Sequence, residues 1–249
     1  MRGITETVKH LLIINVLMFI GTLTIQNGVF YNWFALHFPK NDLFQPWQIL
    51  THMFMHGNFM HIAFNMFALW MFGTAVEQVF GARKFIFFYI SAGLGAAFVM
   101  LGVYYLQYLP LESDILSAGF TSTQIHDTMS TGKVMEGVNI TQRDQLQSMF
   151  YIFNSSMVGA SGAIMGVLVA FGMLFPDSKL MLIFLPVPIK AKYFIPGIIA
   201  LDLISAITGQ SFFSPSNTAY AAHIGGALTG FLMIWYWKKT QFNKNRWDR

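Results

Sequence analysis

The chain has 249 residues, of which 55% are hydrophobic and only 10% are charged. Soluble domains carry about 25% charged residues, so the deficit indicates a membrane protein. The formal net charge of +4 is small and the basic residues are scattered, which argues against a nucleic-acid partner. The chain has no cysteine, which excludes disulfides, thiol catalysis and cysteine-bound zinc.

Six apolar segments are long enough to cross a bilayer. The first, 11–27, follows Arg2 and Lys9 as a signal peptide would, but no small-residue cleavage motif follows it, so we expect a retained helix. The other segments are predicted at 58–80, 84–106, 150–175, 193–209 and 219–238. The sequence therefore predicts an all-α membrane protein with six transmembrane helices, in a single domain over 1–249.

The basic residues orient this bundle by the positive-inside rule. With both termini in the cytoplasm, only Lys40, Lys133 and Arg143 of the 15 basic residues lie outside. The inner set is Arg2, Lys9, Arg83, Lys84, Lys179, Lys190, Lys192, Lys238, Lys239, Lys244, Arg246 and Arg249. We therefore expect a multi-pass protein with cytoplasmic termini, placed in a bacterial inner membrane.

Two segments on the outer side have unusual compositions. Residues 28–50 carry seven aromatic side chains, and such a density suits the lipid headgroup region, so we expect a membrane-embedded first outer loop. Residues 109–148 form a polar insertion rich in Ser, Thr, Gln and Gly. Two interpretations of this insertion are open: a solvated and partly flexible loop, or a flap that contacts substrate.

Ser161 and His223 lie at the same depth in two different spans. Each stands 14 residues before the last apolar residue of its run, which is Phe175 or Trp237. This places both about 21 Å from the inner boundary. A lone serine is most simply a small residue that allows helices to pack, but a histidine in lipid is costly unless it is hydrogen-bonded or functional. Together they indicate a nucleophile and its general base.

Glycines follow both residues at helical spacing. Gly162 and Gly166 follow the serine, and Gly226 and Gly230 follow His223 on its own helix face. Two such bare stripes allow close packing, so we expect a Ser–His hydrogen bond of about 2.6–3.2 Å. The serine begins its helix, where free N–H groups and the helix dipole favour a developing oxyanion.

A third group of polar residues opens the second span. His61 and Asn65 are four residues apart and share one helix face. Their N–H groups can form an oxyanion hole, although a polar network between helices is the alternative, and it remains plausible for His56. A zinc site built on His52, His56 and His61 is disfavoured because the His-Glu-x-x-His pattern lacks its glutamate. We expect no metal and no other cofactor.

Asp202 is an acidic residue within the fifth span. Its carboxylate has two interpretations: it orients His223 as the third member of a triad, or it makes a polar contact between helices. We prefer the second interpretation.

Together these residues resemble the rhomboid family of intramembrane serine proteases. The resemblance covers about residues 11–237, and four motifs occur in the family's order. They are His56-x4-His61-x3-Asn65, Glu77-x3-Gly81, Gly159-Ala160-Ser161-Gly162, and Ala222-His223 with Gly226 and Gly230.

The resemblance implies a rhomboid-like bundle that cleaves transmembrane segments of membrane proteins within the lipid. It implies a Ser161–His223 dyad that needs no third acid and works through an acyl-enzyme. Oxyanion contacts would come from the serine N–H, His61 and Asn65, and His56 would be structural. The segment 208–218 would correspond to the family's lateral cap.

Three features depart from the family pattern. Gln48 follows Trp47 where the family often has arginine, and Met165 stands where a tyrosine often packs on the catalytic ring. The 109–148 insertion is also longer than expected between the third and fourth spans. None of these departures removes a proposed catalytic residue, but they bear on substrate preference and rate.

Two non-proteolytic functions compete with this interpretation. A rhomboid-like pseudoprotease would bind membrane helices without cutting them, yet such proteins usually lack the serine or the histidine, and this chain has both. A proton-coupled transporter would use His223 and Asp202 as relay groups. Transporters often contain internal repeats, and no convincing repeat is visible here.

Overall fold

The computed structural model describes residues 3–25, 28–182, 185–208 and 220–242, and they form mostly helix. The predicted correspondence of 208–218 to a lateral cap lies almost wholly outside these residues. The elements are α1 Glu6–Thr24, α2 Val29–Phe34, β1 Leu36–His37, α3 Gln48–Thr51, η1 His52–Phe54, α4 Phe59–Ala68, η2 Leu69–Gly73, α5 Thr74–Phe80, α6 Ala82–Ser117, α7 Ser122–Thr131, α8 Ile140–Phe153, β2 Ser156–Met157, α9 Ser161–Leu174, β3 Lys179–Leu182, β4 Leu185–Lys190, α10 Ala191–Thr208, α11 Tyr220–Trp237 and η3 Lys238–Phe242.

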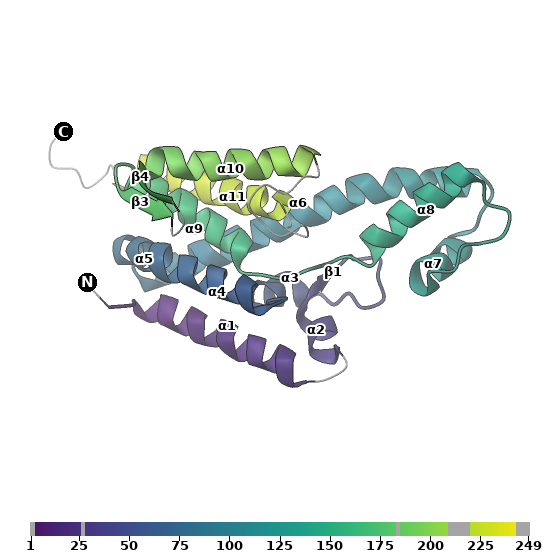
Figure 1. Ribbon diagram of the computed structural model, residues 1–249, viewed down its shortest axis with the longest axis horizontal. Coiled ribbons are helices and arrows are strands. Elements are labelled where there is room, and N and C mark those ends of the chain that lie inside the picture. Colours follow the sequence, from purple (N-terminus) through teal and green to yellow (C-terminus); the bar gives the residue numbers. More distant parts are fainter. Residues whose placement is uncertain (1–2, 26–27, 183–184, 209–219, 243–249) are drawn as a thin grey trace.

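Four helices in the described part of the chain are long and apolar enough to cross a membrane. They are α1, the continuous helix Phe59–Phe80 formed by α4, η2 and α5, the long α6, and α10. The apolar helix α9 is shorter, and α11 occupies the predicted sixth segment. The six-span topology therefore stays a prediction. The helices run side by side as a bundle (Figure 1).

The predicted apolar segment 150–175 is not one continuous helix, and Ser161 begins its helix as expected. The chain leaves α8 at Asn154, runs extended through β2 and enters α9 only at Ser161. Gly159 lies between them with a φ of +126°, a conformation that breaks the helix and suits glycine. The 14 residues of α9 span about 21 Å, so this helix begins inside the depth of a bilayer rather than at its edge.

The centre of the bundle is the close packing of α9, α11 and α6. A Cβ added at Gly226 would lie 1.9 Å from the carbonyl oxygen of Gly162, and one added at Gly230 would lie 2.6 Å from the Cα of Gly166. On the other side of α9, a Cβ at Gly162 would lie 2.5 Å from the Cβ of Ala96. The predicted packing of the two glycine stripes is confirmed, and α6 closes the third side.

Glu77 and Gly81 have separate structural roles at the opposite end of the bundle. The Glu77 carboxylate accepts hydrogen bonds from Thr5 Oγ1 at 2.5 Å, Thr7 N at 3.1 Å and Val8 N at 3.0 Å. It therefore caps the first turn of α1, whose N–H groups have no partner within the helix. Gly81 has a φ of +75° and makes the tight turn between α5 and α6.

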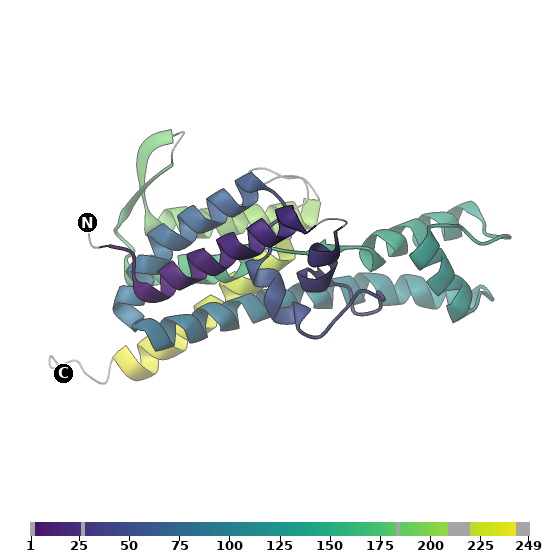
Figure 2. The same ribbon diagram turned by 90° about the horizontal axis from the view of Figure 1, so that it is seen from below.

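The predicted polar insertion folds as helices. The 36 residues of α6 extend about 54 Å, well beyond a hydrocarbon core of about 30 Å. Figures 1 and 2 show the far end of α6 projecting from the bundle with α7 and α8 packed along it. Side chains from these helices and from the first outer loop form an apolar cluster: Phe38, Tyr108, Ile115, Ile125, Met129, Leu146, Met149 and Phe153.

Gln48, the residue that departs from the family pattern, holds the first outer loop together. Its side chain is fully buried. Its amide nitrogen donates hydrogen bonds to the carbonyl oxygens of Asn32 and Leu43 at 2.9 and 2.8 Å. Its amide oxygen accepts from the backbone N–H groups of His37 and Gln45 at 3.3 and 3.1 Å. The loop is therefore braced by one neutral side chain.

We expect Gly226→Ala to lower the free energy of unfolding by about 1–3 kcal/mol or more, because the new methyl group would overlap the Gly162 carbonyl and force α9 and α11 apart. Equilibrium unfolding in detergent micelles measures this change. Gly197→Ala is the matched control, since a Cβ there has no atom within 4 Å. A Gly226→Ala protein as stable as the wild type would contradict the packing described here.

We expect Glu77→Gln to lower the free energy of unfolding by about 1 kcal/mol, because an amide presents an NH₂ group to donors that need an acceptor. Exposed Glu6 in the first turn of α1 provides the control, and Glu6→Gln should change stability much less. Equal effects of the two substitutions, in the same unfolding measurement, would show that charge at the helix start matters rather than the cap.

Candidate active site

Ser161 is the first residue of α9, and the backbone before it is held at two points. β2 pairs antiparallel with β1, with Ser156 opposite His37. The N–H of Gly159 donates to the carbonyl oxygen of His52 at 2.9 Å. These contacts tie the start of α9 to the first outer loop and fix the position of the serine hydroxyl.

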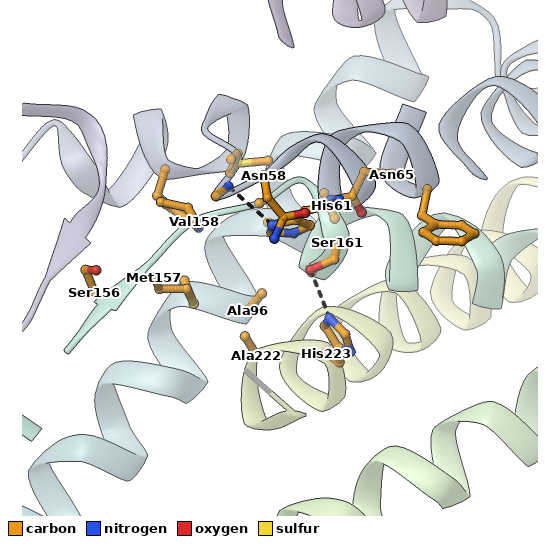
Figure 3. Close-up of a pocket in the computed structure, with 18 of the residues that line it drawn as sticks. Asn58, His61, Asn65, Ala96, Ser156, Met157, Val158, Ser161, Ala222 and His223 are labelled. Atoms are coloured by element: carbon orange, nitrogen blue, oxygen red, sulfur yellow. Dashed lines mark hydrogen bonds between the residues drawn. The ribbon is translucent and has the colours of Figure 1, made fainter. Parts of the chain in front are cut away.

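His223 lies near the start of α11 and faces the serine. Its Nε2 is 2.9 Å from Ser161 Oγ, within the predicted range, and Figure 3 shows the two side chains pointing toward each other. The two side chains come within hydrogen-bonding distance because Gly226, one turn after the histidine, packs directly on Gly162. An unprotonated Nε2 in this position can take the proton of the hydroxyl, which is the arrangement of an activated nucleophile.

The serine and histidine line a cavity of about 640 Å³. Residues of α4, the segment before α9, and the starts of α9 and α11 converge on it (Figure 3). The lining includes all four predicted site residues, namely His61, Asn65, Ser161 and His223. The structure therefore brings together side chains that lie far apart in the sequence, around one space that a peptide could enter.

His61 points into this cavity from the first turn of α4. Asn58 caps that helix by accepting from the His61 backbone N–H at 2.9 Å. The Nδ1 of the ring accepts a long hydrogen bond of 3.5 Å from the N–H of Gly57, which favours the tautomer with its proton on Nε2. A Cβ at Gly159 would lie 2.7 Å from that Nε2 and 3.6 Å from Ser161 Oγ, so both atoms face the same point.

Asn65 lies one turn after His61 and is nearly buried, with 7% of its surface exposed. Its Nδ2 has no hydrogen-bond partner among the described residues. An unpaired buried amide donor is costly, and such groups in native structures often have a ligand or catalytic role. Its position on the cavity wall makes it available to an oxygen of a bound substrate.

The other two histidines of this region have different surroundings. His56 is fully buried and its ring packs edge-on against His61, with centroids 5.0 Å apart, but it does not line the cavity. His52 donates from Nδ1 to the carbonyl oxygen of Gln48 at 2.9 Å, and burial lowers its pKa to about 4. This bracing role of His52 is not predicted from the sequence, although the spacing of four residues between Gln48 and His52 is a signal for it.

Asp202 contacts His223 itself. Its Oδ2 lies 2.9 Å from the histidine Nδ1, and each side chain is 12% exposed. The expected polar contact between helices is present, between α10 and α11, but its partner is the residue that also contacts Ser161. Of the two interpretations left open, the geometry therefore allows both at once.

Metal ligands do not cluster in the described part of the chain: no three side chains of His, Asp or Glu are grouped there so that they could hold a metal ion. His52, His56 and His61 are consecutive histidines of the sequence, but they engage Gln48, one another and the cavity rather than a common centre.

Comparison with known proteins places this site in a family. The sequence model of the Rhomboid domain matches residues 43–240. A rat presenilin-associated rhomboid-like protein, mitochondrial, is 31% identical over 76% of this chain and 36% of its own length. Rhomboid protein 1, mitochondrial, of Saccharomyces cerevisiae is 27% identical over 77% of this chain and 42% of its own length.

A bacterial relative is also similar. Rhomboid protease AarA of Providencia stuartii is 29% identical over 75% of this chain and 54% of its own length. The chain thus matches between a third and a little over half of the length of these curated relatives. The match of the Rhomboid domain covers most of the chain and includes all four residues of the candidate site, so the protein belongs to the rhomboid family.

Proposed function

We propose that this protein is an intramembrane serine endopeptidase that cleaves transmembrane segments of membrane proteins through a Ser161–His223 dyad. The observation that carries the proposal is the 2.9 Å hydrogen bond between Ser161 Oγ and His223 Nε2 at the wall of a cavity within an apolar bundle. A pseudoprotease has no need for this bond. The family membership and the relative named as a protease support the same function.

The reaction would proceed in two stages. His223 Nε2 takes the hydroxyl proton as Ser161 Oγ attacks the carbonyl carbon of the scissile bond, which gives a tetrahedral oxyanion. The oxyanion collapses, the carbon–nitrogen bond breaks, and the imidazolium returns its proton to the leaving amine, which leaves an acyl-enzyme. Water, deprotonated by the same histidine, then attacks the ester and releases the acid and the serine.

The oxyanion would be stabilised by donors on two elements. The backbone N–H of Ser161 lies in the first turn of α9, where N–H groups have no partner within the helix. His61 Nε2 and Asn65 Nδ2 face the cavity from α4. Fixed donors at the place where negative charge develops are worth more in a site that excludes water than they are in solution.

The substrate must present an extended backbone at the cut. A helical segment hides its carbonyl groups in hydrogen bonds, so a transmembrane helix would have to unwind locally before attack. Small residues near the cleaved bond and helix-breaking residues beyond it favour this unwinding. We therefore propose transmembrane proteins as the substrates and surrounding lipid as the solvent of both partners, with no nucleic-acid, metal or cofactor requirement.

We propose an integral, multi-pass location with six spans and both termini in the cytoplasm, because this orientation leaves only 3 of 15 basic residues outside. The aromatic first outer loop, in which Trp33 is 61% and Trp47 48% exposed, would then lie in the headgroup region, and the projecting helices α7 and α8 would lie outside. The bacterial relative favours a bacterial inner membrane, whereas the mitochondrial relatives make an organelle membrane the competing location.

We expect Ser161→Ala to abolish cleavage, because no other group of the dyad can form the ester. The assay uses fusion proteins that each carry one transmembrane helix with a small-residue pair near its outer end, reconstituted in vesicles with the enzyme. Ser205→Ala, which removes a buried hydroxyl from α10, is the control and should retain activity. Turnover that persists in a Ser161→Ala protein would exclude the mechanism.

We expect His61→Ala and Asn65→Ala each to lower kcat by about 10²–10³-fold, the usual effect of removing one oxyanion donor. KM should change little, because the contact forms in the transition state. His126→Ala, on the projecting helix α7, is the control for loss of a histidine. An unchanged kcat in both variants would place the oxyanion elsewhere in the cavity.

A further inference from the structure

The carboxylate of Asp202 is unusual for its surroundings. It is the only acidic residue between Asp177 and Asp248, and it lies in the middle of the apolar helix α10 with 8% of its surface exposed. An ionisable group at membrane depth is costly and is generally retained for a function or held by a partner. The described part of the chain offers it one ion-pair partner, which is His223.

The contact sets the position of the proton on the imidazole. A carboxylate can only accept hydrogen bonds, so at 2.9 Å from Asp202 Oδ2 the Nδ1 of His223 must be the donor. A neutral ring with its proton on Nδ1 has an unprotonated Nε2. That nitrogen lies 2.9 Å from Ser161 Oγ and can accept the hydroxyl proton.

The alternative tautomer would be unproductive. With its proton on Nε2, the ring would donate to Ser161 rather than accept from it, and could not act as the base. A histidine without a fixed partner on Nδ1 samples both tautomers and several ring orientations. The three side chains come from α9, α10 and α11, so the Asp202 contact also holds the ring at the angle that Ser161 requires.

We infer that Asp202 is a positioning residue for the proposed reaction: it selects the tautomer and the orientation of His223 and stabilises the imidazolium that forms when Ser161 attacks. The inference rests on the proposed function and extends the dyad to a triad in this chain. Asp202 does not line the cavity, so it acts through His223 rather than on the substrate.

Because Asp202 lies outside the cavity, its substitution should change kcat and leave KM nearly unchanged. We expect Asp202→Asn, which keeps the size of the side chain but can present an NH₂ group to Nδ1, to lower kcat by about 10²-fold or more. KM should stay within about twofold, since the substrate contacts are intact. Asp202→Glu keeps a carboxylate and should recover part of the lost kcat.

Two controls separate positioning from a loss of structure. Ser205→Ala removes the other buried polar side chain of α10 and should leave kcat unchanged. Thermal unfolding of each variant reports whether the bundle is intact. A structural role alone would lower stability in proportion to activity, whereas a positioning role lowers kcat in a protein that unfolds near the wild-type temperature.

A spectroscopic measurement reads the tautomer in the unmodified protein, and a variant serves only to assign the signal. Nitrogen-15 NMR of histidine-labelled protein, with His223 assigned by its loss in His223→Ala, should show its proton on Nδ1. A proton on Nε2 would overturn the inference, as would a wild-type kcat in Asp202→Asn when the wild type cleaves the fusion proteins. A folded wild type that cleaves none of them would instead refute the proposed function, and the inference with it.

Discussion

The candidate site depends above all on the close approach of α9 and α11. Gly226 lies so near the Gly162 carbonyl that a Cβ would fall 1.9 Å from its oxygen. Gly162 directly follows Ser161, and Gly226 lies three residues after His223, so this contact fixes the separation at which the two side chains meet. In an apolar solvent that provides little hydrophobic driving force between helices, backbone approach at small residues is the main source of such precision.

Polar contacts also hold the start of α9, where Ser161 lies, against the first outer loop. The N–H of Gly159 is bonded to the His52 carbonyl, and the His52 ring is bonded to Gln48, which itself braces the first outer loop. The start of α9 is therefore connected to that loop by a continuous series of hydrogen bonds. A neutral amide, where the family often has an arginine, satisfies this network without placing a charge in the loop.

The sequence predicts the site better than it predicts the path of the chain. The matching depths of Ser161 and His223, and the helical spacing of their glycines, correctly indicate their contact, because both features follow from helix geometry alone. The depth of Asp202 does not reveal its partner, since depth along a helix does not say which way its side chain faces. The sequence predicts that Ser161 begins its helix, but the segment predicted over 150–175 does not separate α9 from the end of α8, although the polar residues Asn154, Ser155 and Ser156 mark that break.

The fold of the projecting helices α7 and α8 is also hard to predict from composition. Their polar composition suggests a flexible loop, yet capping boxes at Thr121–Gln124 and Asn139–Gln142 start α7 and α8, and sparse apolar residues gather on α6 only once the three helices are assembled. The most direct test of the central claim is treatment of the detergent-solubilised protein with a fluorophosphonate, followed by mass spectrometry of the adduct. A single adduct on Ser161 that His223→Ala abolishes is the expected result. A folded wild type without an adduct, or with one on another residue, would contradict an activated Ser161.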